Sequence, residues 1–84
     1  LSLQLFPNPA QAQLNVRFAL PEAAAEVTLQ IRDLSGKFLL RREFEGVKGW
    51  QDVELGVDRL APGMYLLHLI VDEQHVARRF TVIR

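Results

Sequence analysis

Residues 27–37, Val27-Thr28-Leu29-Gln30-Ile31-Arg32-Asp33-Leu34-Ser35-Gly36-Lys37, decide the fold class of this chain. Apolar Val27, Leu29 and Ile31 alternate with polar residues, a period typical of a β-strand with one buried face. Ser35-Gly36 is a turn signal, and the Asp33 side chain is placed to cap that turn. The stretch therefore predicts a strand that leads through a tight turn into a returning hairpin strand.

The same two-residue period recurs on both sides of this stretch, at a spacing of roughly twelve residues. The runs predict seven strands, at residues 1–6, 13–18, 27–32, 37–44, 50–55, 64–71 and 76–82. The nearly continuous apolar run at 64–71 predicts a central strand covered on both faces. Residues 21–26 are too few for a stable helix and are expected to form a loop. The pattern favours an all-β protein, a β-sandwich of about seven antiparallel strands.

Length and composition limit the possible classes of protein. The 84 residues suffice for one domain, residues 1–84, and leave no chain for a second core. Hydrophobic residues make up 49% and charged residues 24%, as in ordinary globular proteins. The formal net charge is zero, which provides no electrostatic case for binding nucleic acid. The run at 64–71 is far too short for a transmembrane segment.

Pro7-Asn8-Pro9 follows Phe6 and interrupts the strand pattern near the start of the chain. Each proline removes a backbone donor and pushes its preceding residue toward extended geometry, so the motif cannot lie inside a central strand. The Asn8 side chain is expected to hydrogen-bond its own local backbone. The segment predicts a rigid corner at the entry to the domain.

The sequence contains little catalytic chemistry. The hydroxyl side chains that could act as nucleophiles are Ser2, Thr28, Ser35 and Thr81. Nucleophilic catalysis requires such a group beside a base. His68 lies in the most apolar run, where a structural role is expected, and His75 is expected to be exposed at a turn. The two histidines and ten acids show no metal-ligand spacing. We therefore expect no enzyme activity, no cofactor and no metal.

Two aromatic residues have a structural and a binding interpretation. An exposed Trp50 could stack on a sugar or anchor a partner, with Phe44 as the other member of the platform. A small sandwich needs large side chains in its core, so Trp50 is expected to be buried there. Tyr65, two residues after Gly63, is likewise expected to be structural.

The end of the chain is basic. Residues 75–84 contain Arg78, Arg79 and Arg84 and no acid. Such a run is interpreted first as a solvated edge, second as protection against edge-to-edge aggregation, and third as a recognition patch for an anionic or carboxylate-rich partner. If the last strand lies at a sheet edge, a partner could also add a strand to it.

Four motifs in order make the chain resemble the C-terminal sorting domains, type A, of the type IX (Por) secretion system. These domains have an aromatic residue before Pro-Asn-Pro, then Asp-x-x-Gly-Lys at a strand end, then Leu-x-x-Gly-x-Tyr before an apolar strand, and a basic closing strand. The matching residues are Phe6, Pro7, Asn8, Pro9, Asp33, Gly36, Lys37, Leu60, Gly63 and Tyr65, with residues 78–84 as the closing strand. The family often has lysines at its end, whereas this chain has arginines, whose head groups differ in geometry.

The resemblance implies an immunoglobulin-like β-sandwich that serves as a secretion address and performs no chemistry. It implies a larger cargo, covalently joined upstream, that reaches the periplasm by its own signal peptide. The outer-membrane translocon then recognises the domain, and a surface sortase commonly removes it, which leaves the cargo secreted or at the cell surface. We hypothesise that Arg78, Arg79 and the Arg84 end carry translocon recognition. An adhesive or carbohydrate-binding sandwich, and a passive spacer between modules, are the alternatives.

Overall fold

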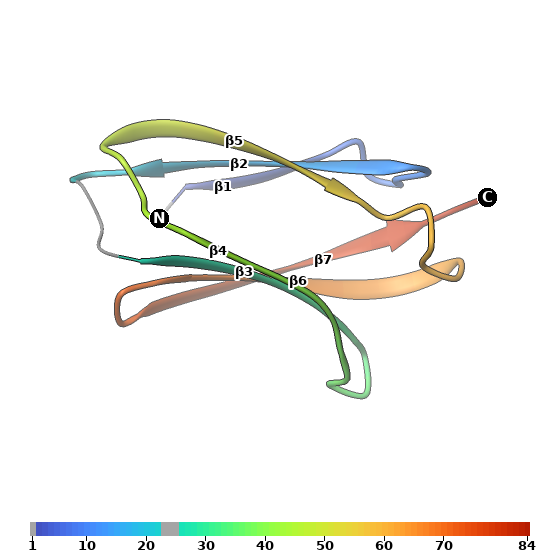
Figure 1. Ribbon diagram of the computed structural model, residues 1–84. Helices are drawn as coiled ribbons and strands as arrows, with labels where there is room; N and C mark the ends of the chain where they lie inside the picture. The colour runs from blue at the N-terminus through green and yellow to red at the C-terminus, as the bar shows by residue number, and fades with distance from the viewer. Residues whose placement is uncertain (1, 23–25) are drawn as a thin grey trace.

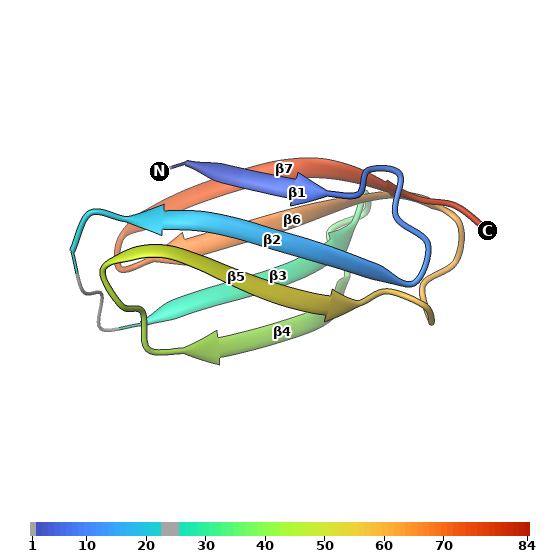
Figure 2. The same cartoon turned by 90° about the horizontal axis from the view of Figure 1, so that it is seen from above.

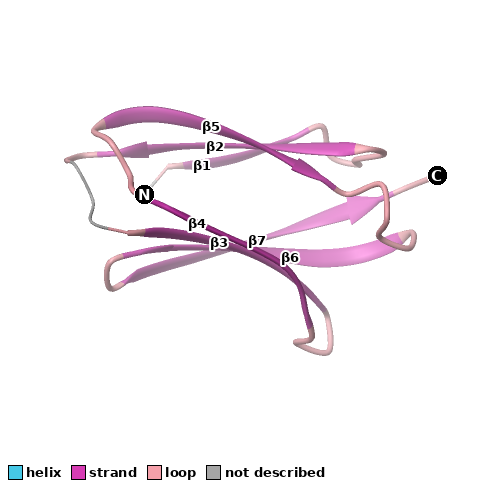
Figure 3. Ribbon diagram, viewed as in Figure 1, coloured by secondary structure: helices cyan, strands magenta, loops and turns pink. Residues whose placement is uncertain are grey.

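A computed structural model describes residues 2–22 and 26–84. These residues fold into two β-sheets that pack face to face (Figures 1 and 3). These residues form seven strands and no helix: β1 (Leu3–Phe6), β2 (Gln13–Leu20), β3 (Val27–Asp33), β4 (Phe38–Phe44), β5 (Gly49–Gly56), β6 (Gly63–Val71) and β7 (Gln74–Val82). The predicted all-β sandwich is confirmed. The expected loop at 21–26 lies partly outside the described residues.

The strands pair in an immunoglobulin-like arrangement. One sheet has the order β1-β2-β5, the other has the order β4-β3-β6-β7, and all neighbours within a sheet are antiparallel. β1 lies above β7 at one side of the sandwich, and β5 and β4 lie at the opposite side (Figure 2). The last strand, β7, is therefore an edge strand of the four-stranded sheet.

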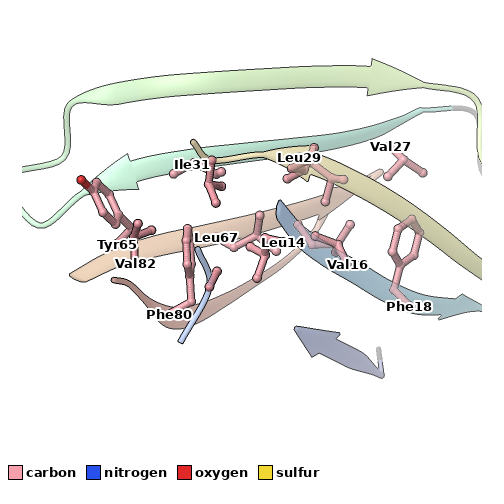
Figure 4. Packing of buried hydrophobic residues seen from close by; sticks show 14 of the residues in the cluster. Leu14, Val16, Phe18, Val27, Leu29, Ile31, Tyr65, Leu67, Phe80 and Val82 are labelled. Atoms are coloured by element: carbon pink, nitrogen blue, oxygen red, sulfur yellow. The ribbon is translucent and has the colours of Figure 1, made fainter. Parts of the chain in front are cut away.

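Alternating side chains from both sheets fill the core between them. In β2 every second residue is buried, and in β6 the same alternation runs from Tyr65 to Val71. Figure 4 shows the two sets of side chains facing one another. The largest fully buried side chains are Phe18, Phe80, Leu14, Leu29, Ile31, Leu55, Leu67 and Leu69. The apolar residues that recur at every second position of the sequence therefore form the single buried layer between the two sheets.

The prediction that β6 is covered on both faces is wrong. β6 is central in its sheet, but Tyr65, Leu67, Leu69 and Val71 face the core while the residues between them point outward. On this outer face Met64 is 40% exposed. A two-layer sandwich has no third layer to cover it, so the apolar outer residues of β6 are shielded only by side chains on neighbouring strands.

Candidate functional site

The Pro-Asn-Pro corner carries the chain from one sheet to the other. β1 ends at Phe6 in the three-stranded sheet, and Ala10, beyond the corner, forms a parallel bridge with Val82 of β7. The Ala10 N–H donates to the Thr81 carbonyl at 2.8 Å, and the Ile83 N–H donates to the Ala10 carbonyl at 2.9 Å. Ala10 is fully buried. The corner thus positions the first segment against the last strand.

Asn8 extends this contact with its side chain. The Thr81 N–H donates to Asn8 Oδ1 at 3.0 Å, where the next backbone bond of a longer parallel pair would fall. The local backbone bond predicted for Asn8 is wrong, because its amide oxygen is used by β7. The Phe6-Pro7 and Asn8-Pro9 peptide bonds are cis. The corner and the end of β7 are one hydrogen-bonded unit.

Arg84 is held by backbone carbonyls of two loops. Its guanidinium donates to the carbonyls of Gln11 at 2.7 Å, Val57 at 3.0 Å and Asp58 at 2.9 Å, and also to that of Leu60. Gln11 lies between the corner and β2, and the other three acceptors lie between β5 and β6. A planar group with five donors suits such a convergence of acceptors. Several of its N–H groups are therefore used inside the domain.

The Asp33 carboxylate closes the turn between β3 and β4. Asp33 Oδ1 accepts hydrogen bonds from the Ser35 hydroxyl at 2.6 Å, the Ser35 N–H at 2.9 Å and the Lys37 N–H at 3.0 Å. The Ser35 hydroxyl and the Lys37 N–H hold the pKa of this carboxyl below its usual value. Gly36 has a φ of 93°, a left-handed conformation that glycine adopts without a steric penalty. In this motif Lys37 contributes its backbone.

Tyr65 forms a second corner at the start of β6. Its hydroxyl donates to the Ala61 carbonyl, and its ring stacks on Phe80 with centroids 5.7 Å apart. Leu60 packs against the core, and Gly63 has a positive φ of 155°. A tyrosine near the start of this strand that bonds back to the preceding loop is a hallmark of immunoglobulin-like domains. The Leu-x-x-Gly-x-Tyr residues thus join the β5–β6 loop to the core.

The three C-terminal arginines do not form one patch. Arg78 lies opposite Leu67 and Arg79 lies opposite Leu66, so their side chains point to opposite faces of the sheet. Both are exposed on the edge strand. Arg84 lies beyond β7, bound to the loops.

A family model described as the secretion system C-terminal sorting domain matches residues 4–83. The chain belongs to this family. It is a C-terminal sorting signal of the type IX secretion system, part of a cargo that this system carries across the outer membrane to the cell surface or the medium. A search of curated proteins finds no match to the chain. The match includes the corner, the Asp33 turn, the Tyr65 corner and the closing strand up to Ile83.

Trp50 of the sorting domain is not in the core, and its predicted burial is wrong. Its side chain is 60% exposed. Inward-facing Val53 and Leu55 fix the alternation of β5, which turns Trp50 outward; counting back from Leu55 would have shown this. Phe44 instead packs on Phe18, with ring centroids 6.3 Å apart. The structure therefore does not bring Trp50 and Phe44 together as a platform.

The two histidines of the sorting domain lie side by side on its surface. His68 Nδ1 is 2.6 Å from His75 Nε2, on the outer face of β6 and β7. Burial, the charge of Arg32 and the charge of His75 lower the pKa of His68. Within residues 2–22 and 26–84, no three His, Cys, Asp or Glu side chains gather as metal ligands. The same residues contain no helix long and apolar enough to cross a membrane.

Proposed function

We propose that the sorting domain is a non-catalytic address that the outer-membrane translocon recognises through β7, and that a surface sortase then removes it from the cargo. The observation that carries this proposal is the family match over residues 4–83, which covers β2 to β7 and all of β1 except Leu3. The described residues offer no nucleophile hydrogen-bonded to a histidine, which supports a role as substrate rather than enzyme.

The edge of β7 is the feature that fits recognition. The corner covers this edge only from Thr81 onward, and residues 74–80 have β6 as their one strand neighbour among the described residues. Arg78 and Arg79 are exposed along the open part. Guanidinium groups bind carboxylates through two parallel hydrogen bonds, so an acidic partner strand is well matched to this edge.

The experiment is secretion of a reporter fused to residues 1–84 in a host with this secretion system. Deletion of residues 75–84 would remove core residues Phe80 and Val82, and is therefore expected to unfold the domain. The informative variant is Arg78→Ala with Arg79→Ala, which leaves the core intact and is expected to reduce secretion. Arg41→Ala with Arg42→Ala is the matched control, because these arginines are also adjacent and exposed on an edge strand of the same sheet. Equal secretion of both double variants and the wild type would contradict recognition through β7.

Removal by a sortase is tested on the secreted fusion itself. Mass spectrometry of the reporter from the cell surface and the medium is expected to show a product without the sorting domain. A reporter that keeps all 84 residues in every secreted form would rule out this step.

A second candidate function is glycan binding, which the exposure of Trp50 favours. An exposed indole offers a flat apolar surface on which a sugar ring can stack. Glycan-array binding that is lost in Trp50→Ala would support it. Phe38→Ala is the matched control, since Phe38 is 56% exposed on the other sheet. Absence of any glycan ligand for the wild type would exclude this candidate.

A further inference from the structure

An apolar stripe runs along the outer face of β6. Met64, Leu66 and Ile70 point away from the core, and Met64 is 40% exposed while the other two are partly exposed. His68 lies between Leu66 and Ile70 on this face, so the continuous apolar part consists of Met64 and Leu66. β6 is the third of four strands in its sheet, so this stripe lies within the face and not at its edge. Antiparallel sandwiches usually present polar residues on the outer face. A contiguous apolar surface rimmed by polar residues marks an interaction site more often than scattered apolar residues do.

Two arginines flank this stripe in a single row across three strands. Arg32 of β3 lies directly opposite Leu66, and Arg79 of β7 lies opposite Leu66 on its other side. Side chains in such positions have Cβ atoms about 5 Å apart, so the three residues are immediate neighbours. Across the three strands, Leu66 therefore lies between two positively charged side chains, Arg32 and Arg79.

Neither arginine of this row is neutralised by a carboxylate within residues 2–22 and 26–84. The Arg32 guanidinium donates to Gln30 Oε1 at 3.0 Å and lies 4.1 Å from the ring centroid of Phe38. Arg32 Nε is buried and has no hydrogen-bond partner among the described residues, and the neighbouring His68 Nε2 is likewise buried without a partner. The guanidinium N–H at Arg32 Nε is a donor without an acceptor, which favours a ligand that brings anionic oxygen to this surface.

The outer face of the other sheet has the opposite character. There Arg17 Nε is 2.7 Å from Asp52 Oδ1, and Glu54 is a further acid on the same face of β5. The positive charge of that face is therefore already compensated. Although the whole chain has no net charge, the face of β3, β6 and β7 is the one complementary to an acid.

We propose that Arg32, Met64, Leu66 and Arg79 form the docking surface for a protein segment that places carboxylates on either side of an apolar side chain. The inference deepens the sorting function and rests on it, because the segment is taken to belong to the export machinery. The apolar side chain covers Leu66 and Met64, and the carboxylates pair with the two guanidinium groups. Recognition then uses the outer face of the sheet next to β7, and not only its edge.

The test compares two adjacent arginines that point to opposite faces. Reporter secretion is expected to fall about tenfold in Arg79→Glu, as for loss of an anchoring contact, and less than about twofold in Arg78→Glu. The two variants have the same change of charge on the same strand. An equal fall, or a larger fall in Arg78→Glu, would overturn the outer-face surface while leaving the sorting function intact. A wild-type fusion that stays in the periplasm would count against the sorting function itself.

A binding measurement makes the same distinction in the purified chain. The probe is the peptide acetyl-Glu-Leu-Glu-Leu-Glu-amide, added to the isotope-labelled chain, with the matching lysine peptide as control. Amide signals of residues 64–68 and 77–81 are expected to shift with the acidic peptide, and the shifts are expected to vanish in Arg79→Glu. If Arg79→Glu lowers the melting temperature, Met64→Glu tests the same surface at an exposed position. Shifts caused only by an anionic polysaccharide such as dextran sulfate, or shifts on the face of Trp50, would overturn the proposal.

Discussion

Replacement of Arg84 by glutamine is expected to destabilise the fold. The guanidinium joins the last residue to the carbonyls of Gln11, Val57, Asp58 and Leu60. A hydrogen bond from a charged donor contributes about 1.5–3 kcal/mol, and solvent-exposed bonds contribute much less. The hydrogen bond to Val57 is part-buried, and we assign about 1.5 kcal/mol to it. The bonds to Gln11 at 2.7 Å and Asp58 at 2.9 Å are exposed, and we assign about 0.5 kcal/mol to the exposed bonds together.

The sum, about 2 kcal/mol, corresponds to a fall in melting temperature of about 8–16 °C for a domain of this size. Thermal unfolding followed by circular dichroism measures it. Arg79→Gln is the matched control, since its side chain is exposed on the same terminal segment and its replacement is expected to change stability by less than about 0.5 kcal/mol. Arg84→Lys keeps the charge but loses the planar fork, and is expected to lie between Arg84→Gln and the wild type.

The result that would refute this reasoning is an Arg84→Gln variant that melts within about 2 °C of the wild type, which is at most half of the shift of about 4–8 °C expected for 1 kcal/mol. The guanidinium bonds would then contribute little in solution, and Arg84 would be free to contact the translocon. If the variant is destabilised as expected, its secretion defect should shrink at lower growth temperature, because the defect would come from unfolding.

Three further predictions concern the corners and the histidine pair. Tyr65→Phe removes the hydrogen bond to Ala61 and should cost about 1 kcal/mol in a urea titration; an unchanged midpoint would contradict it. The pKa of Asp33 is lowered in the folded state, so the ionised carboxylate stabilises the fold above the unfolded-state pKa of 3.8. This stabilisation is lost as pH falls through the folded-state pKa. The stability of Asp33→Asn should therefore fall less than that of the wild type when both are titrated with acid. The pKa of His68 is also lowered in the folded state, so stability should decline as pH falls below the unfolded-state value of 6.5, and His68→Gln should weaken that decline. An identical pH profile in the variant would mean that His68 does not control it.

The strands and turns could be predicted from short stretches of sequence. Alternation at Val27, Leu29 and Ile31 identifies β3, and Ser35-Gly36 identifies the turn that Asp33 closes. These features depend on residues within a few positions of one another, so the local pattern is enough to find them. The outward direction of Trp50 also follows from the local pattern, because Val53 and Leu55 face the core and residues at even positions of β5 therefore point outward.

The contacts that make the site belong to the tertiary structure alone. Asn8 and Thr81, and likewise Gln11 and Arg84, are separated by 73 residues in the chain, and no local period relates them. The row of Arg32, Leu66 and Arg79 depends on the register of β3 with β6 and of β6 with β7. Register and strand order follow from which faces are buried together across the whole domain. The sequence by itself therefore determined the strands, their turns and the family. Only the packing of distant strands decided that Arg84 binds loop carbonyls while Arg32 and Arg79 lie in one row on the outer face of a sheet.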